Sequence, residues 1–205
     1  TDHLKQAAFE VGLFYPPDLS SSDWCTIGGN VAENSGGATA LKYGVTGQYV
    51  LGLEGFLATG EPFSFGGKLH KDVAGYDMKR LLVGSEGTLA IITKIILKLI
   101  PQPKYDMSLW CSFESFEKAV GFMQEVNHSS VRPVCIEFME KTCMDAVETA
   151  WKETLSCHHG EAAVLIRCDA YHQDQLDKDC DAIKRIGTRF QATIHQGEGA
   201  RYWQI

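Results

Sequence analysis

The chain has 205 residues, 44% hydrophobic and 22% charged, which is enough to bury one large core or two small ones. Its 26 acidic residues outnumber its 19 Lys and Arg residues, the formal net charge is -7, and no Lys/Arg-rich run occurs. This balance argues against a protein that binds nucleic acid by neutralising phosphates. The most apolar segment, residues 89–100, contains Lys94 and Lys98 and is too short to cross a bilayer.

The cysteines and the first residues indicate the setting of the chain. Seven cysteines without a C-x-x-C pair predict free thiols and a reducing, cytoplasmic compartment. The opening residues, TDHLKQAAFE, lack both an initiator Met and the layout of a signal peptide. We therefore expect the chain to be a piece of a longer protein.

The composition changes near residue 103. Fifteen of the 20 glycines precede residue 104, whereas six of the seven cysteines follow it, and Pro101 and Pro103 mark the change. We therefore predict two domains, residues 1–103 and 104–205.

The first part is predicted to be a loop-rich α+β domain, because glycine pairs separate its short apolar runs. A strand over residues 48–58 should turn at residues 59–61 into a second strand over 63–65. Besides this hairpin, the pattern predicts a helix over 4–11, a helix over 76–83 closed by Gly84, and a long buried strand over 88–100.

The second part alternates the periods of strand and helix. Strands are predicted over residues 107–113, 134–138, 162–168 and 190–194. Helices are predicted over 116–123, over 143–151 behind a Thr142-x-x-Asp145 capping box, and over 176–183 closed by Gly187. If the middle helix is an insertion, the remainder is the split β-α-β arrangement of a ferredoxin-like domain, and a flavodoxin-like parallel sheet is the alternative.

Several catalytic motifs are absent from the sequence. There is no G-x-G-x-x-G, H-E-x-x-H or G-x-S-x-G. Gly67-Lys68 is not a phosphate loop, because Pro62 and Leu69 stand where that motif needs a glycine and a hydroxyl residue. The pair His158-His159 is expected to lie in a solvated loop.

The run TIGGNVAENSGG, residues 26–37, is the strongest candidate for binding. Two glycine pairs let a backbone approach a ligand closely, and successive outward N–H groups form an anion site that suits a diphosphate. Asn30, Asn34 and Ser35 add neutral donors, whereas Glu33 argues mildly against a bare phosphate. Ordinary turns are the alternative interpretation of the same glycines.

A series of segments between Tyr15 and Pro103 resembles one flavoprotein family. In order they read PPDLSSS, TIGGNVAENSGG, LKYG, VLGLEGFLATGE, KDVAGYDMKRLLVGSEGTLAIITK and LKLIPQP. They resemble glycolate oxidase flavin subunits and FAD-linked D-lactate dehydrogenases of the vanillyl-alcohol oxidase or PCMH group. The resemblance implies an α+β fold: the C-terminal part of a PCMH-type FAD-binding domain, followed by the start of a ferredoxin-like cap domain.

The resemblance also assigns residues to the FAD. It places Pro17, Asp18 and Ser20 near the flavin and ribityl, and Thr26, Gly28, Gly29 and Asn30 along the diphosphate. It places Glu33, Asn34, Gly36 and Gly37 beside the diphosphate with Tyr43 and Gly44 on the same wall, and Glu86, Gly87, Leu89 and Ile91 at the adenine end. Each assignment has a structural alternative: Asp18 could only nucleate its loop, Tyr43 could be core, and Glu86 could only cap a turn. Cys25 is expected to be a small buried residue.

Two parts of the family pattern are missing from this sequence. There is no earlier FAD subdomain with its own glycine-rich loop, and no clustered cap histidines for a divalent metal. No catalytic or metal role is therefore assigned to any of the seven histidines. Without the first subdomain, Leu4, Phe9, Phe14 and Tyr15 should be uncovered, which favours either self-association into a homo-oligomer or disorder in the first ~20 residues.

The resemblance implies oxidation of a small 2-hydroxy acid, such as glycolate or D-lactate, by hydride transfer to FAD. A separate acceptor, an iron-sulfur or electron-transfer subunit or a quinone, would take the electrons and could hold the protein at a membrane surface. We expect this chain alone to be inactive and to bind FAD weakly or not at all. The alternatives are a non-catalytic FAD-binding subunit of a multi-chain dehydrogenase and a ferredoxin-like interaction module.

Overall fold

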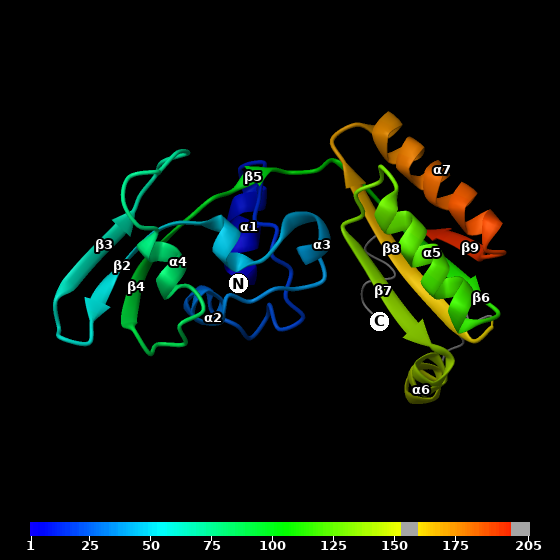
Figure 1. Ribbon diagram of the computed structural model, residues 1–205, viewed down its shortest axis with the longest axis horizontal. Coiled ribbons are helices and arrows are strands. Elements are labelled where there is room, and N and C mark those ends of the chain that lie inside the picture. Colours follow the sequence, from blue (N-terminus) through cyan, green and yellow to red (C-terminus); the bar gives the residue numbers. More distant parts are fainter. Residues whose placement is uncertain (153–159, 198–205) are drawn as a thin grey trace. The chain divides into compact units, whose positions relative to one another are not determined.

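The computed structural model describes residues 1–152 and 160–197, so His158 and His159 lie outside the described residues. The chain divides into two compact units, Thr1–Gln102 and Pro103–Ile205 (Figure 1). We call them unit 1 and unit 2.

Unit 1 combines short helices with two antiparallel sheets. Its helices are α1 (Asp2–Glu10), α2 (Ile27–Glu33), α3 (Ala40–Tyr43), the 3-10 helix η1 (Thr46–Tyr49) and α4 (Met78–Leu82). Its strands are β1 (Leu13–Phe14), β2 (Val50–Leu57), β3 (Pro62–Gly66), β4 (Ala90–Leu97) and β5 (Ile100–Pro101). The strand orders are β3-β2-β4 and β1-β5.

The hairpin predicted from the turn residues is confirmed. β2 pairs antiparallel with β3, with Phe56 opposite Pro62 and Leu53 opposite Phe65. The predicted helices over 4–11 and 76–83 are present as α1 and α4, and Gly84 follows α4 with φ 82°. Turn chemistry and apolar periodicity therefore determined these elements.

The prediction of a long buried strand over 88–100 was wrong in length and in burial. β4 ends at Leu97 and β5 is separate. Val31 of α2 and Leu82 of α4 pack on one face of the β3-β2-β4 sheet, where Leu53 is fully buried. Alternate residues of β4 point the other way, so Ile91 is 70% exposed. A run of β-branched residues does not distinguish a strand covered on both faces from one covered on a single face.

The described part of unit 2 forms a four-stranded sheet with three helices. In chain order it contains β6 (Tyr105–Phe113), α5 (Phe116–His128), β7 (Cys135–Glu140), α6 (Lys141–Trp151), β8 (Ala162–Ala170), α7 (Gln173–Arg189) and β9 (Thr193–Gly197). The strand order is β7-β8-β6-β9 and every pairing is antiparallel. With α6 as the insertion between β7 and β8, this is the ferredoxin-like arrangement, and the antiparallel pairings exclude the flavodoxin-like alternative.

The two faces of this sheet are covered differently. α5 and α7 lie against one face of the sheet (Figure 1). They bury Phe122 and Ile183 there, together with Leu109 and Ile166 of the strands. On the opposite face, α6 covers a smaller cluster around Trp110. The main core of unit 2 therefore lies between the sheet and the helices α5 and α7.

Three local predictions in unit 2 were wrong. Thr142 is not a cap: Glu140 is both the end of β7 and the N-cap of α6, and the Lys141 amide donates to the Glu161 carbonyl at 3.0 Å. Gly187 does not end α7, which continues to Arg189. A Cβ on Gly187 would lie 2.7 Å from Ile194 Cδ1, so this glycine instead permits close packing of β9 against the helix.

The last strand also begins later than residue 190. Phe190 is the C-cap of α7, and Gln191 has φ 59°, a left-handed conformation in which the strand cannot start. β9 therefore begins at Thr193.

The expected exposure of apolar residues near the start of the chain is only partly observed. Phe9 is 57% exposed, whereas Tyr15 is fully buried and its ring meets that of Tyr49 edge-on at 6.0 Å. Leu4 and Phe14 are half-buried. None of the described helices is long and apolar enough to cross a membrane.

Candidate cofactor site

Helix α2 begins with a side-chain cap that orders the first glycine pair. Thr26 is the N-cap, and its Oγ1 accepts from the Gly29 amide at 3.0 Å, while the Asn30 amide donates to the Thr26 carbonyl. The backbone hydrogen bonds of the described residues do not include the amides of Ile27 and Gly28. We call residues 26–29 the α2 shelf.

The α2 shelf has open space above it. A Cβ placed on Gly28 would meet only Thr26 Oγ1, at 3.9 Å, and both glycines of the pair are exposed. Free backbone donors at the first turn of a helix are suited to an anionic group. The shelf therefore fits one side of a pyrophosphate.

The second glycine pair serves the protein's own packing. A Cβ on Gly37 would lie 1.9 Å from the Asp18 carbonyl oxygen, so only glycine fits against this loop. A Cβ on Gly36 would lie 3.3 Å from Val45 Cγ1. Gly37 is thereby brought close to Asp18, with Pro17 buried before it and Ser20 exposed after it, whereas Gly36 packs against Val45.

The other end of α2 gathers a second set of the predicted residues. Asn34, the left-handed C-cap at φ 53°, accepts from the Gly47 amide through Oδ1 at 2.8 Å. The Gly84 and Glu86 amides donate to the Val31 and Ala32 carbonyls. The turn at Glu86 (φ 50°) and Gly87 (φ 75°) is thereby fixed to the end of α2, near exposed Glu33.

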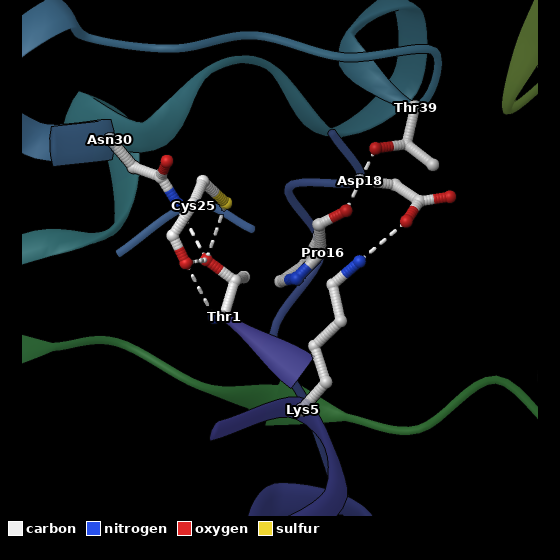
Figure 2. A network of polar contacts seen from close by, with 7 residues as sticks. All are labelled: Thr1, Lys5, Pro16, Asp18, Cys25, Asn30 and Thr39. Carbon is white, nitrogen blue, oxygen red and sulfur yellow. Dashed lines mark hydrogen bonds and ion pairs between the residues drawn. The ribbon is translucent and has the colours of Figure 1, made fainter. Parts of the chain in front are cut away.

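Some predicted residues lie apart from this group or point inward. Ile91 lies opposite Phe56 on the face of the sheet away from the Val31 core, and Leu89 precedes β4 with 44% exposure. Asn30 is 2% exposed and its Nδ2 donates to Thr1 Oγ1 at 2.8 Å (Figure 2).

Tyr43 and Gly44 form the end of α3. The Tyr43 ring meets Phe14 edge-on at 5.8 Å, and its carbonyl accepts from the Tyr49 hydroxyl at 2.8 Å. Gly44 has φ 76°, and a Cβ there would collide with the Gln48 side chain. Both residues are half-buried, so packing within unit 1 already accounts for much of their environment.

One thiol, that of Cys25, and one phenol, that of Tyr15, have shifted pKa values in this region. Burial raises the pKa of the Cys25 thiol, but hydrogen bonds with Thr1 and Asn30 outweigh it, so the pKa lies below its ordinary value of 9.0. Burial raises the pKa of the Tyr15 phenol above 10.0, which the neighbouring Thr46 side chain opposes in part. The expectation that Cys25 is buried was wrong, because it is half-exposed.

Sequence reasoning missed a polar cleft beside these residues. A cavity of about 280 Å³ lies between η1 and α4, and its lining includes Gln48, His70, Lys79 and Arg80. A smaller one of about 170 Å³ shares Gln48 and Arg80 and reaches Asn34. The sequence did contain a signal for this cleft: the basic pair Lys79-Arg80, which precedes the GSEG turn of residues 84–87.

The charges of the larger cavity are mostly compensated within the protein. Lys79 Nζ lies 3.0 Å from Asp77 and 3.4 Å from Asp72. The hydrogen bond between Lys79 and Asp77 lowers the pKa of that carboxyl and raises the pKa of the lysine.

The chain consists of a loop-rich α+β unit that carries the α2 shelf, followed by a ferredoxin-like unit. Residues 1–66 match the family described as "FAD binding domain", and residues 102–205 match "FAD linked oxidases, C-terminal domain". The chain belongs to the FAD-linked oxidase family.

Comparison with curated proteins gives relatives at moderate identity. Glycolate oxidase subunit GlcD of Bacillus subtilis is 43% identical over 175 residues, which are 85% of this chain and 37% of that protein. D-lactate dehydrogenase of Archaeoglobus fulgidus is 40% identical over 184 residues, 90% of this chain and 41% of that protein. The chain therefore spans about two fifths of the length of these relatives.

Solved structures share the fold at low sequence identity. An alkyldihydroxyacetonephosphate synthase has a TM-score of 0.76 at 20% identity, covering 97% of this chain and 39% of that one. A 4-ethylphenol oxidase from Gulosibacter chungangensis has a TM-score of 0.69 at 19% identity, covering 94% and 42%. The predicted fold class and family are confirmed.

Proposed function

We propose that this chain is part of an FAD-dependent oxidoreductase that oxidises a small 2-hydroxy acid similar to glycolate or D-lactate. The names of the relatives at 43% and 40% identity support this substrate class. The observation that carries the proposal is the α2 shelf, where two amides lack an acceptor among the described residues and space is open over Gly28. A dinucleotide pyrophosphate needs such donors with room above them.

The residues expected from the sequence are proposed as the cofactor contacts of this chain. The α2 shelf would hold the diphosphate, and the loop at Pro17, Asp18 and Ser20 would lie near the flavin and ribityl. The second group consists of Asn30, Glu33, Asn34, Gly36, Gly37, Tyr43 and Gly44 along the same wall, and of Glu86, Gly87, Leu89 and Ile91 toward the adenine.

Bound FAD would supply the acceptor for the hydrogen and electron pair that leave the hydroxy acid's α-carbon. The residues named above bind and orient, and the base for the hydroxyl proton is not assigned among them.

The two units correspond in this proposal to two parts of the family's architecture. Residues 1–103 are assigned to the second subdomain of the FAD-binding domain, and residues 104–205 to the start of the cap. The chain alone should be inactive and bind FAD weakly, because a ligand held from one side loses buried surface and preorganised contacts.

Calorimetric titration of FAD into the purified chain tests the site. We expect a dissociation constant above about 1 µM for the wild type and about tenfold weaker binding for Gly28→Ala. The added methyl group has room in the free protein but occupies the space over the α2 shelf. Ala also favours a helix over Gly, so the thermal midpoint should not fall.

Gly67→Ala is the matched control, because a Cβ there meets nothing within 4 Å and it lies outside the α2 shelf. Equal FAD affinity in the wild type and Gly28→Ala would contradict the proposed site. A submicromolar dissociation constant for FAD and the wild type would contradict the expectation that this chain alone binds FAD weakly.

The partners and the compartment follow the same proposal. One relative is named as a subunit of glycolate oxidase, which supports a separate electron acceptor. We propose that this acceptor is an iron-sulfur or electron-transfer subunit or a quinone. The six described cysteines are all free, which supports a reducing compartment such as the cytoplasm. Self-association into a homo-oligomer stays a prediction.

A further inference from the structure

The loop of residues 15–18 has little backbone bonding of its own. Pro16 and Pro17 have no N–H group, and the backbone hydrogen bonds of the described residues include none donated by residues 15–18. Yet Tyr15, Pro16 and Pro17 are buried. A buried segment without ladder hydrogen bonds must be fixed by side chains or by packing.

Three contacts from elsewhere in unit 1 hold this loop (Figure 2). The buried Thr39 hydroxyl donates to the Pro16 carbonyl at 2.7 Å. Lys5 of α1 forms an ion pair with the Asp18 carboxylate. The third contact, which Figure 2 does not draw, is the close approach of Gly37, where an added Cβ would lie 1.9 Å from the Asp18 carbonyl oxygen. The contacts come from two separate parts of the chain, α1 and residues 37–39, and together they restrain the loop.

We propose that Lys5 and Thr39 are positioning residues, which hold the loop of residues 16–18 in the conformation that receives the flavin. The inference rests on the proposed function, which places Pro17 and Asp18 near the flavin and ribityl. Thr39 acts through the Pro16 carbonyl, and Lys5 acts through Asp18. Neither side chain needs to touch the cofactor.

The Lys5–Asp18 ion pair also has an electrostatic consequence. The Asp18 carboxylate would repel the negatively charged diphosphate of a dinucleotide, and a paired lysine offsets that repulsion. The side chains of Lys5 and Asp18 are only 23% and 27% exposed, so solvent screens the pair less than a fully exposed one. Removing Lys5 should therefore loosen the loop and leave an uncompensated negative charge.

Hydrogen-deuterium exchange of the whole chain tests the positioning without the cofactor. Thr39→Val should raise the exchange of the amides of residues 18–22 by roughly tenfold, the factor that corresponds to one lost hydrogen bond. Thr39→Ser keeps the hydroxyl and should restore the wild-type rate. Unchanged exchange in Thr39→Val would overturn the positioning role, and Thr39→Ser serves as the folded reference if the valine variant is unstable.

FAD titration of the same variants tests whether the positioning matters for the cofactor. Lys5→Met and Thr39→Val should each weaken FAD binding by about tenfold. Adding Asp18→Asn to Lys5→Met should recover much of the affinity, because the amide removes the charge that Lys5 neutralises. Lys94→Met removes a more exposed ion pair outside the proposed site, with Glu54 at 2.8 Å, and should leave binding unchanged.

The outcomes separate the two proposals. If the wild type binds FAD and Lys5→Met and Thr39→Val bind it equally well, the positioning role fails and the proposed function stands. If the wild type shows no FAD binding at any concentration, the proposed function fails, and the role of the loop in it fails as well. A double variant weaker than Lys5→Met would overturn the action of Lys5 through Asp18.

Discussion

Single polar side chains hold the turns of unit 1. Thr26, Asn34 and Thr39 each bond to a backbone group in a turn or at a helix end, at distances between 2.7 and 3.0 Å. Each such bond contributes about 1 kcal/mol, and leaving a buried partner unsatisfied costs more. The loops near the proposed cofactor site therefore depend on a few individual residues.

The described cysteines should differ sharply in reactivity. Burial raises the pKa of the Cys111 thiol to about 12, whereas Cys143 is exposed and the pKa of Cys25 is lowered. Only the thiolate reacts with iodoacetamide, so at pH 8 Cys25 and Cys143 should be labelled and Cys111 should not. Peptide mass spectrometry measures this, with the urea-unfolded chain as the control in which all three react. Labelling of Cys111 in the folded chain at the rate of Cys143 would contradict its burial.

The motif around the glycines predicted donors, but it did not predict where each donor points. Thr26 before Ile27 is a readable N-cap, and the first glycine pair lies at the helix start as expected. Asn30 instead faces inward, because packing of the whole unit decides which side of α2 is buried. That information is not local to the motif.

At the scale of elements, turn chemistry and the period of the apolar residues were more informative than apolar content alone. The β2-β3 hairpin follows from residues 59–61, and the order of strands and helices in unit 2 follows from periodicity. The half-exposed β4 and the internal glycine of α7 could not be predicted, because both depend on which partner element packs against them. Proposed site residues on or before β4 therefore remain less constrained than those near α2.

The Lys79 ion pair should stabilise α4 within a defined pH range. The pKa of Asp77 lies below its ordinary 3.8 because of its hydrogen bond with Lys79, so this contribution is present above pH 3.8 and disappears as the pH falls through the lowered value. The raised pKa of Lys79 preserves the contribution up to pH 10.5, and it is lost as the pH rises through that raised value.

Lys79→Met keeps the aliphatic contact with Gly66 and removes the charge. At pH 7 it should lower the free energy of unfolding by roughly 0.5–1 kcal/mol, discounted because Asp77 is half-exposed. Urea unfolding at pH 7 and below pH 3 measures the difference, which should shrink in acid. Lys94→Met, which removes an exposed ion pair, is the control. If Lys79→Met lowers the free energy of unfolding equally at both pH values, the ion pair is not the cause.

At the scale of the whole chain, each unit has its own core. Leu53 and Val31 belong to the cluster of unit 1, whereas Leu109 and Phe122 belong to the main cluster of unit 2. A domain with its own core can unfold as its own cooperative unit.

We therefore expect two thermal transitions that respond to different substitutions. Leu53→Ala should lower the midpoint of one transition and Phe122→Ala that of the other. Each should reduce the free energy of unfolding of its unit by about 3 kcal/mol, because both side chains are fully buried. Differential scanning calorimetry measures the two midpoints. Conservative Leu53→Met and Phe122→Leu variants should shift them less. A single transition lowered equally by both alanine variants would show that the units unfold together.

The separate cores also affect how such a chain can change over evolutionary time. A destabilising replacement beneath α5 or α7 lowers the free energy of unfolding of unit 2 and leaves that of unit 1, which contains the α2 shelf, unchanged. Drift in one half therefore does not have to be matched by compensating drift in the other. Descendants of one ancestral gene can alter the ferredoxin-like half widely while inheriting the same glycines of the α2 shelf.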